Sequence, residues 1–265
     1  MELGIKLSAG LFPVLDDFRE NPEKTLKQLA SVGYEGIELY GNFIHSPKVI
    51  RDICQQYQLD ISGAQTSWRY LNQAHLQEVM DYNYELGIKN IIISALGGPW
   101  ESGHKKKENT ISTWLSHVEK MNELQEVLSQ NGFTLSYHTH DYDFGEKIEG
   151  KQTSFELIFQ NTNQLVGIEV DTGSSIKGKQ CPQKLIKALG KRAHLVHCKP
   201  IREDDSFDVN LGEPNDVNDW KEILTACLQA GTQWLVVEPE NKLESGLTAL
   251  TKSYQNITSL MKTKK

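Results

Sequence analysis

The chain has 265 residues, of which 38% are hydrophobic, and its formal net charge is −7. This length and hydrophobic content are sufficient for one large domain, and an acidic chain without a long basic segment argues against nucleic acid or an anionic membrane as a partner. The four cysteines form no C-x-x-C pair, and no segment has the pattern of a signal peptide or a membrane span. We therefore expect a soluble, cytoplasmic protein.

Short apolar runs alternate with longer amphipathic segments along the whole chain. Several of the runs are nearly continuous in β-branched residues and leucine, which is typical of parallel strands that are covered by helices. The eight runs cover residues 3–10, 34–41, 59–65, 89–98, 133–140, 166–173, 193–200 and 233–240.

The segments between these runs carry helix signals. After the first run, Asn21 is a suitable N-cap, Pro22 suits the first helical position, and Gly33 ends the apolar periodicity. The segments 109–132 and 216–231 repeat this plan, and each ends at a glycine. We therefore predict helices that connect the strands.

Eight strand-then-helix units in a chain of this length predict an α/β fold, a (β/α)₈ TIM barrel, formed by residues 1–265 as a single domain. A doubly wound sheet is the less suitable alternative, because the first strand is not followed by a G-x-G-x-x-G turn. In a (β/α)₈ barrel the active site lies at the C-terminal ends of the strands. The polar residues at those ends are therefore the candidates for function.

The predicted strand ends carry an unusual set of polar side chains. They are Glu38, Gln65, His138, His140, Asp171, His197 and Glu238. Because strand side chains alternate between faces, His138 and His140 are expected to point the same way, with Thr139 opposite. A group of two histidines, an aspartate and a glutamate from four consecutive strands is a suitable ligand set for Mn²⁺, Zn²⁺, Co²⁺ or Mg²⁺. A polar barrel mouth without a metal is the alternative.

Several motifs occur in a fixed order along nearly the whole chain. They are "FRENPEKTLKQLASVGYEGIELYG", "YHTHDYDF", "IEVDTG", "HLVHCKP", "LGEPNDVNDWKEIL" and "WLVVEPE". In this order they resemble the motifs of the sugar phosphate isomerase/epimerase family, which consists of xylose isomerase-like TIM barrels. No single motif is diagnostic, but the ordered set is specific.

The resemblance implies a divalent metal held by His138, Asp171, His197 and Glu238. The best-understood epimerases of the family have a glutamate where this chain has His138, so their relay of two glutamates cannot be transferred directly. Glu238 would then be the first acid/base group, and His140 would be the second.

Four residues at the barrel mouth are candidates for substrate binding, namely Glu38, Gln65, Trp100 and Lys199. Glu38 could instead tie the barrel mouth together, Trp100 could cap the barrel, and Lys199 could form a structural ion pair. The chain departs from the family pattern at three positions. Relatives often have histidine at the positions of Gln65 and Ser174, and aspartate at the position of Pro200.

The expected activity is that of a metal-dependent isomerase or epimerase of carbohydrate metabolism, or of a related lyase. It would act on a small sugar or keto-sugar, with Glu238 removing a proton to form a metal-stabilised enediolate. A non-catalytic sugar-binding barrel and a metal-dependent hydrolase are the alternatives. The sequence does not identify the exact substrate, whether it is phosphorylated, or which metal is bound. It also does not decide between isomerase, epimerase and dehydratase. The oligomeric state is open, and a homo-oligomer is one option.

Overall fold

The strands form a closed parallel barrel in chain order, and the computed structural model describes residues 4–96 and 110–262. Each strand pairs with the next, and β8 pairs with β1 to close the ring. The strands are β1 (Lys6–Gly10), β2 (Gly36–Tyr40), β3 (Asp60–Thr66), β4 (Asn90–Ile93), β5 (Thr134–His138), β6 (Gly167–Asp171), β7 (Leu195–Cys198) and β8 (Trp234–Val237). Each strand lies within one of the predicted runs, apart from β3, which extends one residue beyond its run. The predicted (β/α)₈ barrel is therefore confirmed.

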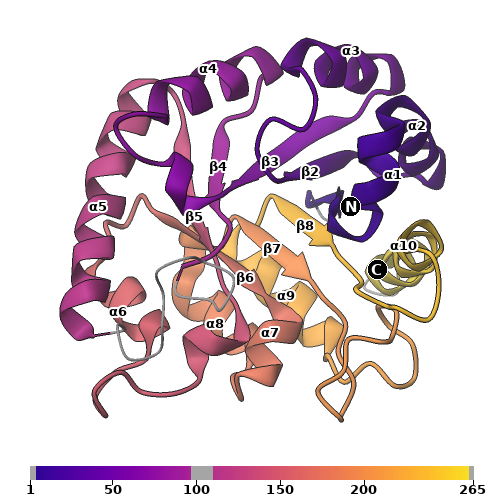
Figure 1. Ribbon diagram of the computed structural model, residues 1–265. Helices are drawn as coiled ribbons and strands as arrows, with labels where there is room; N and C mark the ends of the chain where they lie inside the picture. The colour runs from indigo at the N-terminus through magenta and orange to yellow at the C-terminus, as the bar shows by residue number, and fades with distance from the viewer. Residues whose placement is uncertain (1–3, 97–109, 263–265) are drawn as a thin grey trace.

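Helices surround the barrel and cover its outer face (Figure 1). Within the described residues they are α1 (Leu15–Glu20), α2 (Pro22–Val32), α3 (Pro47–Tyr57), α4 (Leu76–Leu86), α5 (Ile111–Gln130), α6 (Ser154–Asn161), α7 (Thr172–Lys177), α8 (Pro182–Leu189), α9 (Trp220–Ala230) and α10 (Gly246–Lys262). The predicted caps are present at α2, because the Asn21 side chain accepts from Lys24 N at 3.0 Å and Gly33 takes the left-handed conformation with φ +116°. None of the described helices is long and apolar enough to cross a bilayer.

The barrel interior changes character along its axis. In the middle of the barrel the interior includes small hydroxyl side chains, and the hydroxyls of Ser8 and Ser62 lie 2.8 Å apart. Toward the C-terminal ends the interior is filled by large ionisable side chains. In β6, Ile168 and Val170 point outward into the helix layer, so Glu169 and Asp171 point inward.

The register places the ionisable residues of three strands side by side. His138 of β5 is paired with Glu169 of β6, and Asp171 of β6 is paired with His197 of β7. Parallel strands in this register bring side chains from neighbouring positions to one level of the barrel. The local strand geometry therefore accounts for the clustering of these residues.

The two ends of the chain meet where the ring closes. Figure 1 shows α10 beside the first helices, and Tyr34 donates a hydrogen bond to the carbonyl oxygen of Leu250 at 2.9 Å. The first residue of α10, Gly246, lies so close to the loop after β1 that a Cβ atom would be 1.9 Å from the Pro13 carbonyl oxygen. Glycine is therefore required at this contact.

Candidate metal centre

A cavity of about 760 Å³ lies at the C-terminal ends of the strands. Its floor includes His138, Lys199 and Glu238, and its wall includes His140 and Gln65. Five of the residues singled out in the sequence thus meet at one cavity. The position agrees with the general location of active sites in (β/α)₈ barrels.

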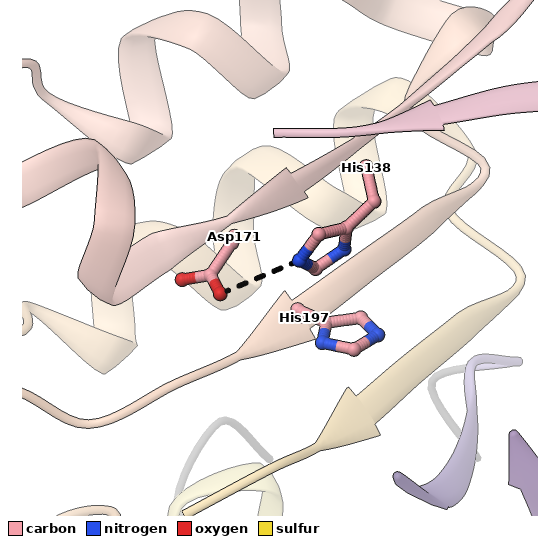
Figure 2. A group of neighbouring side chains, drawn as sticks. All are labelled: His138, Asp171 and His197. Atoms are coloured by element: carbon pink, nitrogen blue, oxygen red, sulfur yellow. Dashed lines mark ion pairs between the residues drawn. The ribbon is translucent and has the colours of Figure 1, made fainter. Parts of the chain in front are cut away.

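Three of the four expected metal ligands, His138, Asp171 and His197, lie together at the bottom of this cavity, and the fourth, Glu238, contacts His197. His138 Nε2 lies 3.8 Å from Asp171 Oδ2, and His197 Nδ1 lies 3.3 Å from Glu238 Oε2. Figure 2 shows the His138 ring directed toward the Asp171 carboxylate, with the His197 ring beside both. One donor atom from each of these three residues lies within 4.8 Å of the other two.

One oxygen of Asp171 lacks a hydrogen-bond donor. Asp171 Oδ1 accepts from Ser174 N at 2.8 Å, whereas Oδ2 is buried and accepts no hydrogen bond from the described residues. A buried carboxylate oxygen without a hydrogen bond is costly unless a cation lies beside it. Lys199 Nζ lies 3.5 Å from Oδ2, and a metal would supply a second positive charge there. Two imidazoles and two carboxylates also form a donor set that suits Zn²⁺, Mn²⁺ or Co²⁺. The residues present therefore fit a divalent metal.

Lys199 adds a buried positive charge at the edge of the cluster. Its Nζ lies 3.5 Å from Asp171 Oδ2 and 3.8 Å from Glu238 Oε2, and it donates a hydrogen bond to Glu240 Oε1. Burial alone would lower the pKa of this lysine, but the three carboxylates outweigh burial and raise it. Lys199 is therefore a permanent cation beside the expected ligands.

The two histidines of the centre differ in electrostatics. Burial lowers the pKa of His138 well below its ordinary value, and the neighbouring His197 lowers it further. Burial acts in the same direction on His197, but the carboxylates of Glu169, Glu38 and Glu238 outweigh it and raise the pKa of His197 well above the ordinary value. The acidic surroundings that favour a proton on His197 would equally favour a divalent cation.

His140 lies beside His138 as the strand alternation predicts. The two rings are 4.8 Å apart, and His140 stacks on Tyr142 with an interplanar angle of 10°. Its backbone N–H donates to Asp143 Oδ2 at 2.8 Å, and the phenol of Tyr137 donates to Asp143 Oδ1 at 2.9 Å. Burial lowers the pKa of His140 to about 3, so its imidazole is neutral at neutral pH.

The residues expected to bind substrate occupy different depths. Gln65 lines the cavity and donates through Nε2 to Glu38 Oε1 at 3.1 Å. The same oxygen of Glu38 lies 2.7 Å from His197 Nε2, so Glu38 stands behind His197. Lys199 lines the cavity, and Trp100 lies outside the described residues.

Two acidic residues of the centre were missed in the sequence analysis. Glu169 hydrogen-bonds His138 Nδ1 at 2.8 Å, and Glu240 pairs with Lys199 at the cavity. Both stand two positions from an expected ligand, Glu169 before Asp171 and Glu240 after Glu238. The period-two rule that grouped His138 with His140 also applies to these positions and could have identified them.

The closed barrel, with a candidate metal-ligand cluster at its C-terminal mouth, places the chain in the (β/α)₈ class of proteins. The model of the family described as xylose isomerase-like TIM barrel matches residues 26–257. The chain belongs to this family.

Relatives of known name share about a quarter of their residues with this chain. An inosose dehydratase of Geobacillus kaustophilus is 26% identical over 69% of this chain, and the match spans 63% of that relative, which is less than two thirds of its length. An inosose dehydratase of Geobacillus thermodenitrificans is 26% identical over 82% of each chain. The rhizopine catabolism protein MocC of Rhizobium meliloti is 22% identical over 82% of this chain and 74% of its own.

Solved structures show the same fold at lower identity. A sugar phosphate isomerase/epimerase from Parabacteroides distasonis has a TM-score of 0.79 and 20% identity over 97% of this chain and 96% of its own. The D-psicose 3-epimerase of Clostridium cellulolyticum, with D-tagatose, has a TM-score of 0.69 and 13% identity over 98% of this chain and 99% of its own. At these identities the similarity establishes the fold alone.

Proposed function

We propose that the protein is a divalent-metal-dependent isomerase, epimerase or related lyase that acts on a small sugar or keto-sugar. The observation that carries the proposal is the group formed by His138, Asp171 and His197 from three consecutive strands, with Glu238 of the next strand in contact with His197. Asp171 Oδ2 is buried and accepts no hydrogen bond from the described residues. The family and the names of the relatives support the same class of chemistry.

His138, Asp171, His197 and Glu238 would hold the metal. When bound, the ion would polarise adjacent carbonyl and hydroxyl oxygens of a sugar and stabilise an enediolate. Lys199 adds a fixed positive charge close to the same place, so it lowers the free energy of any anion that forms there.

Glu238 is the proposed proton acceptor. Burial would raise its pKa, but His197 and Lys199 outweigh burial and lower it, so the carboxylate is ionised at neutral pH. It lines the cavity and can reach a bound sugar. His140 is the second proposed proton-transfer group, and because it is neutral it accepts a proton before it can donate one.

The fate of the enediolate decides which reaction is catalysed. Return of the proton to the neighbouring carbon isomerises the sugar, return to the opposite face epimerises it, and loss of a β-hydroxyl dehydrates it. The curated relatives named inosose dehydratase support testing dehydration first. The cavity wall offers aromatic and amide groups from Phe12, Trp68 and Gln65, which suit the apolar faces and hydroxyls of a sugar ring.

The four cysteines are all free, which supports the proposed location in the reducing cytoplasm.

Metal analysis of purified variants tests the site. We expect about one ion per wild-type chain and a large loss in Asp171→Ala and His197→Ala, because each variant removes a donor from the group. Asp205→Ala is the matched control, because Asp205 pairs with Lys179 on an exposed loop. Unchanged metal content in both Asp171→Ala and His197→Ala would refute the site.

Proton exchange in heavy water tests the chemistry. The metal-loaded protein would be incubated with a panel of ketoses and inososes, and the products monitored by NMR. Deuterium at the carbon next to the carbonyl, with loss of a neighbouring hydroxyl, indicates the lyase, whereas exchange with retention of all hydroxyls indicates the isomerase or epimerase. Tight metal binding without any exchange would favour the non-catalytic barrel, and turnover of esters or amides would favour the hydrolase.

A further inference from the structure

Each histidine of the metal centre lies between an inner and an outer acidic residue. The inner nitrogen of His138 is Nδ1, 2.8 Å from Glu169 Oε2, and its outer nitrogen Nε2 faces Asp171. The inner nitrogen of His197 is Nε2, 2.7 Å from Glu38 Oε1, and its outer nitrogen Nδ1 faces Glu238. We refer to Glu38 and Glu169 as the inner carboxyl pair.

The backbone holds the inner carboxyl pair in these positions. Glu169 is the register partner of His138 on the adjacent strand, so its side chain lies directly beside the imidazole. Glu38 projects from β2 on the other side of the barrel and is also held by Gln65 Nε2. Both glutamates are fully buried, with side chains no more than 2% exposed, so water does not compete for these hydrogen bonds.

The chemistry of the two partners fixes where each histidine carries its proton. We take the carboxyl oxygen that faces each ring as the acceptor, which makes the nearby ring nitrogen the N–H donor. A neutral imidazole that is N–H on one side has its lone pair on the other side. The lone pair of His138 is consequently on Nε2, which faces Asp171. His197 Nδ1 lies within hydrogen-bond distance of Glu238 Oε2, at 3.3 Å, so this nitrogen has to give up a proton before it can bind a metal.

A second metal between Glu38, Glu169 and His197 is a less suitable explanation. Two ligand atoms bound to one ion at about 2.0–2.1 Å are separated by about 2.9–3.4 Å at octahedral or tetrahedral angles. The 2.7 Å between His197 Nε2 and Glu38 Oε1 is shorter than this range and is an ordinary N–H···O hydrogen bond. Glu169 Oε2 is also already hydrogen-bonded to His138.

We propose that Glu169 and Glu38 are positioning residues. Glu169 fixes His138 as the Nδ1–H tautomer, and Glu38 keeps a proton on His197 Nε2 when a metal displaces the proton on Nδ1, so that both rings can present a lone pair to the metal. This inference rests on the proposed metal-dependent function but concerns residues behind the ligands. An acceptor behind a metal-binding histidine orients the ring and raises its basicity, which typically changes metal affinity 10–100-fold.

Two substitutions of Glu169 separate hydrogen bonding from charge. Glu169→Gln keeps an acceptor oxygen, whereas Glu169→Leu keeps the approximate volume and removes the acceptor. Glu38→Gln and Glu38→Leu form the matched pair for His197. All four would be compared with wild type for thermal unfolding, so that loss of folding is recognised separately.

The tautomers can be read without any metal. In long-range ¹⁵N–¹H spectra of the metal-free protein, with His138 assigned by His138→Gln, we expect the Nδ1–H form in wild type and in Glu169→Gln. We expect the Nε2–H form to appear in Glu169→Leu. A wild-type His138 in the Nε2–H form, or an unchanged Nδ1–H form in Glu169→Leu, would overturn the inference.

Metal affinity is the second readout. With Co²⁺ as the probe in competition with a chelator, we expect Glu169→Leu to bind about 10–100-fold more weakly than wild type. We expect Glu169→Gln to remain within about threefold, because its amide oxygen accepts the same hydrogen bond. Wild-type affinity in Glu169→Leu, combined with loss in Asp171→Ala, would refute the positioning role while leaving the metal site intact. Failure of wild type to bind Co²⁺ would refute the proposed function, and the tautomer spectra would still decide the inference.

Discussion

The two halves of the barrel contribute different chemistry to one cavity. Of the described residues that line it, those from the half containing β1–β4 are almost all neutral or aromatic, with Arg69 as the single charge. Those from the half containing β5–β8 are mostly ionisable, and they include His138, Lys199 and Glu238. The same architecture repeated eight times thus carries reactive groups on one side and a binding wall on the other.

This difference shows how a symmetric scaffold becomes an asymmetric site. Each strand ends at the same rim, so the side chain placed there is free to differ from strand to strand. The β5–β8 half gathers its charges at adjacent positions, where they alter one another's pKa values. We therefore expect substitutions in this half to affect turnover, and substitutions in the other half to affect substrate affinity.

The largest effect is expected for Glu238→Gln. The amide cannot accept the substrate proton and is a weaker metal ligand, so kcat should fall by about 10³-fold or more. Steady-state kinetics at saturating metal would measure this, with circular dichroism as the check on folding. A kcat within tenfold of wild type would show that the β5–β8 half does not carry the proton transfer.

Lys199→Met tests the charges of the β5–β8 half by their effect on the free energy of unfolding. The variant leaves three acidic groups around an apolar side chain, and an uncompensated buried charge costs about 3–5 kcal/mol in the free energy of unfolding. Lys199→Arg keeps the charge and is the matched control. Chemical denaturation in the presence of chelator would measure both variants, and equal stability of Lys199→Met and wild type would contradict the electrostatic account.

The pKa of His140 predicts a pH dependence with a definite sign. Because burial lowers this pKa to about 3, the unfolded chain binds more protons than the folded chain below pH 6.5. The stability contributed by the neutral ring is therefore complete above pH 6.5 and is lost as the pH falls. Between pH 7 and pH 5 we expect the advantage of wild type over His140→Gln to shrink by about 2 kcal/mol.

Wild type has to be compared with a variant because Asp143 contributes a pH dependence of stability that is opposite in sign to that of His140. Burial raises its pKa to about 7, so its contribution grows as the pH falls below that value. Denaturation curves of wild type and His140→Gln at pH 7, 6 and 5 would isolate the histidine. Parallel pH dependences for the two proteins would show that His140 is not buried as a neutral ring.

The smallest effect is expected in the β1–β4 half. Phe12 is 39% exposed at the cavity rim and contacts Tyr40 with ring centroids 4.9 Å apart. If it covers one face of the sugar, Phe12→Ala should raise KM by about fivefold to tenfold and change kcat little, because such contacts contribute about 1 kcal/mol. Phe207→Ala is the matched control substitution in the β5–β8 half, because the Phe207 ring lies 4.8 Å from Lys199 Nζ. If Phe12→Ala lowers kcat instead of raising KM, the division between the halves fails.

The fold could be predicted from the sequence because each strand and helix carries its own local signal. The caps of α2 at Asn21 and Gly33 and the continuous apolar runs depend on neighbours in the chain. The register of parallel strands then brings His138, Asp171 and His197 together without further information. The grouping of the strand-end residues is therefore a product of topology.

The roles of Glu38, Glu169 and Glu240 were not predictable in the same way. For Glu38 the sequence left substrate binding and a structural role at the barrel mouth open, and its 2.7 Å contact with His197 Nε2 depends on the rotamers of both side chains. Glu169 could be assigned to the barrel interior from its spacing, but which nitrogen of His138 it contacts depends on the rotamers of both residues. Such details require coordinates.

The contact of Gly246 with Pro13 has a consequence for how the protein is made. β8 can pair with β1 only after β8 has left the ribosome, and α10 then packs against the segment around Pro13, which was synthesised earlier. Glu238 comes directly after β8, so its carboxylate reaches His197 only when the ring is complete. A chain halted before β8 would therefore display an incomplete set of the proposed ligands, and binding at the proposed metal centre would be a late event in biosynthesis.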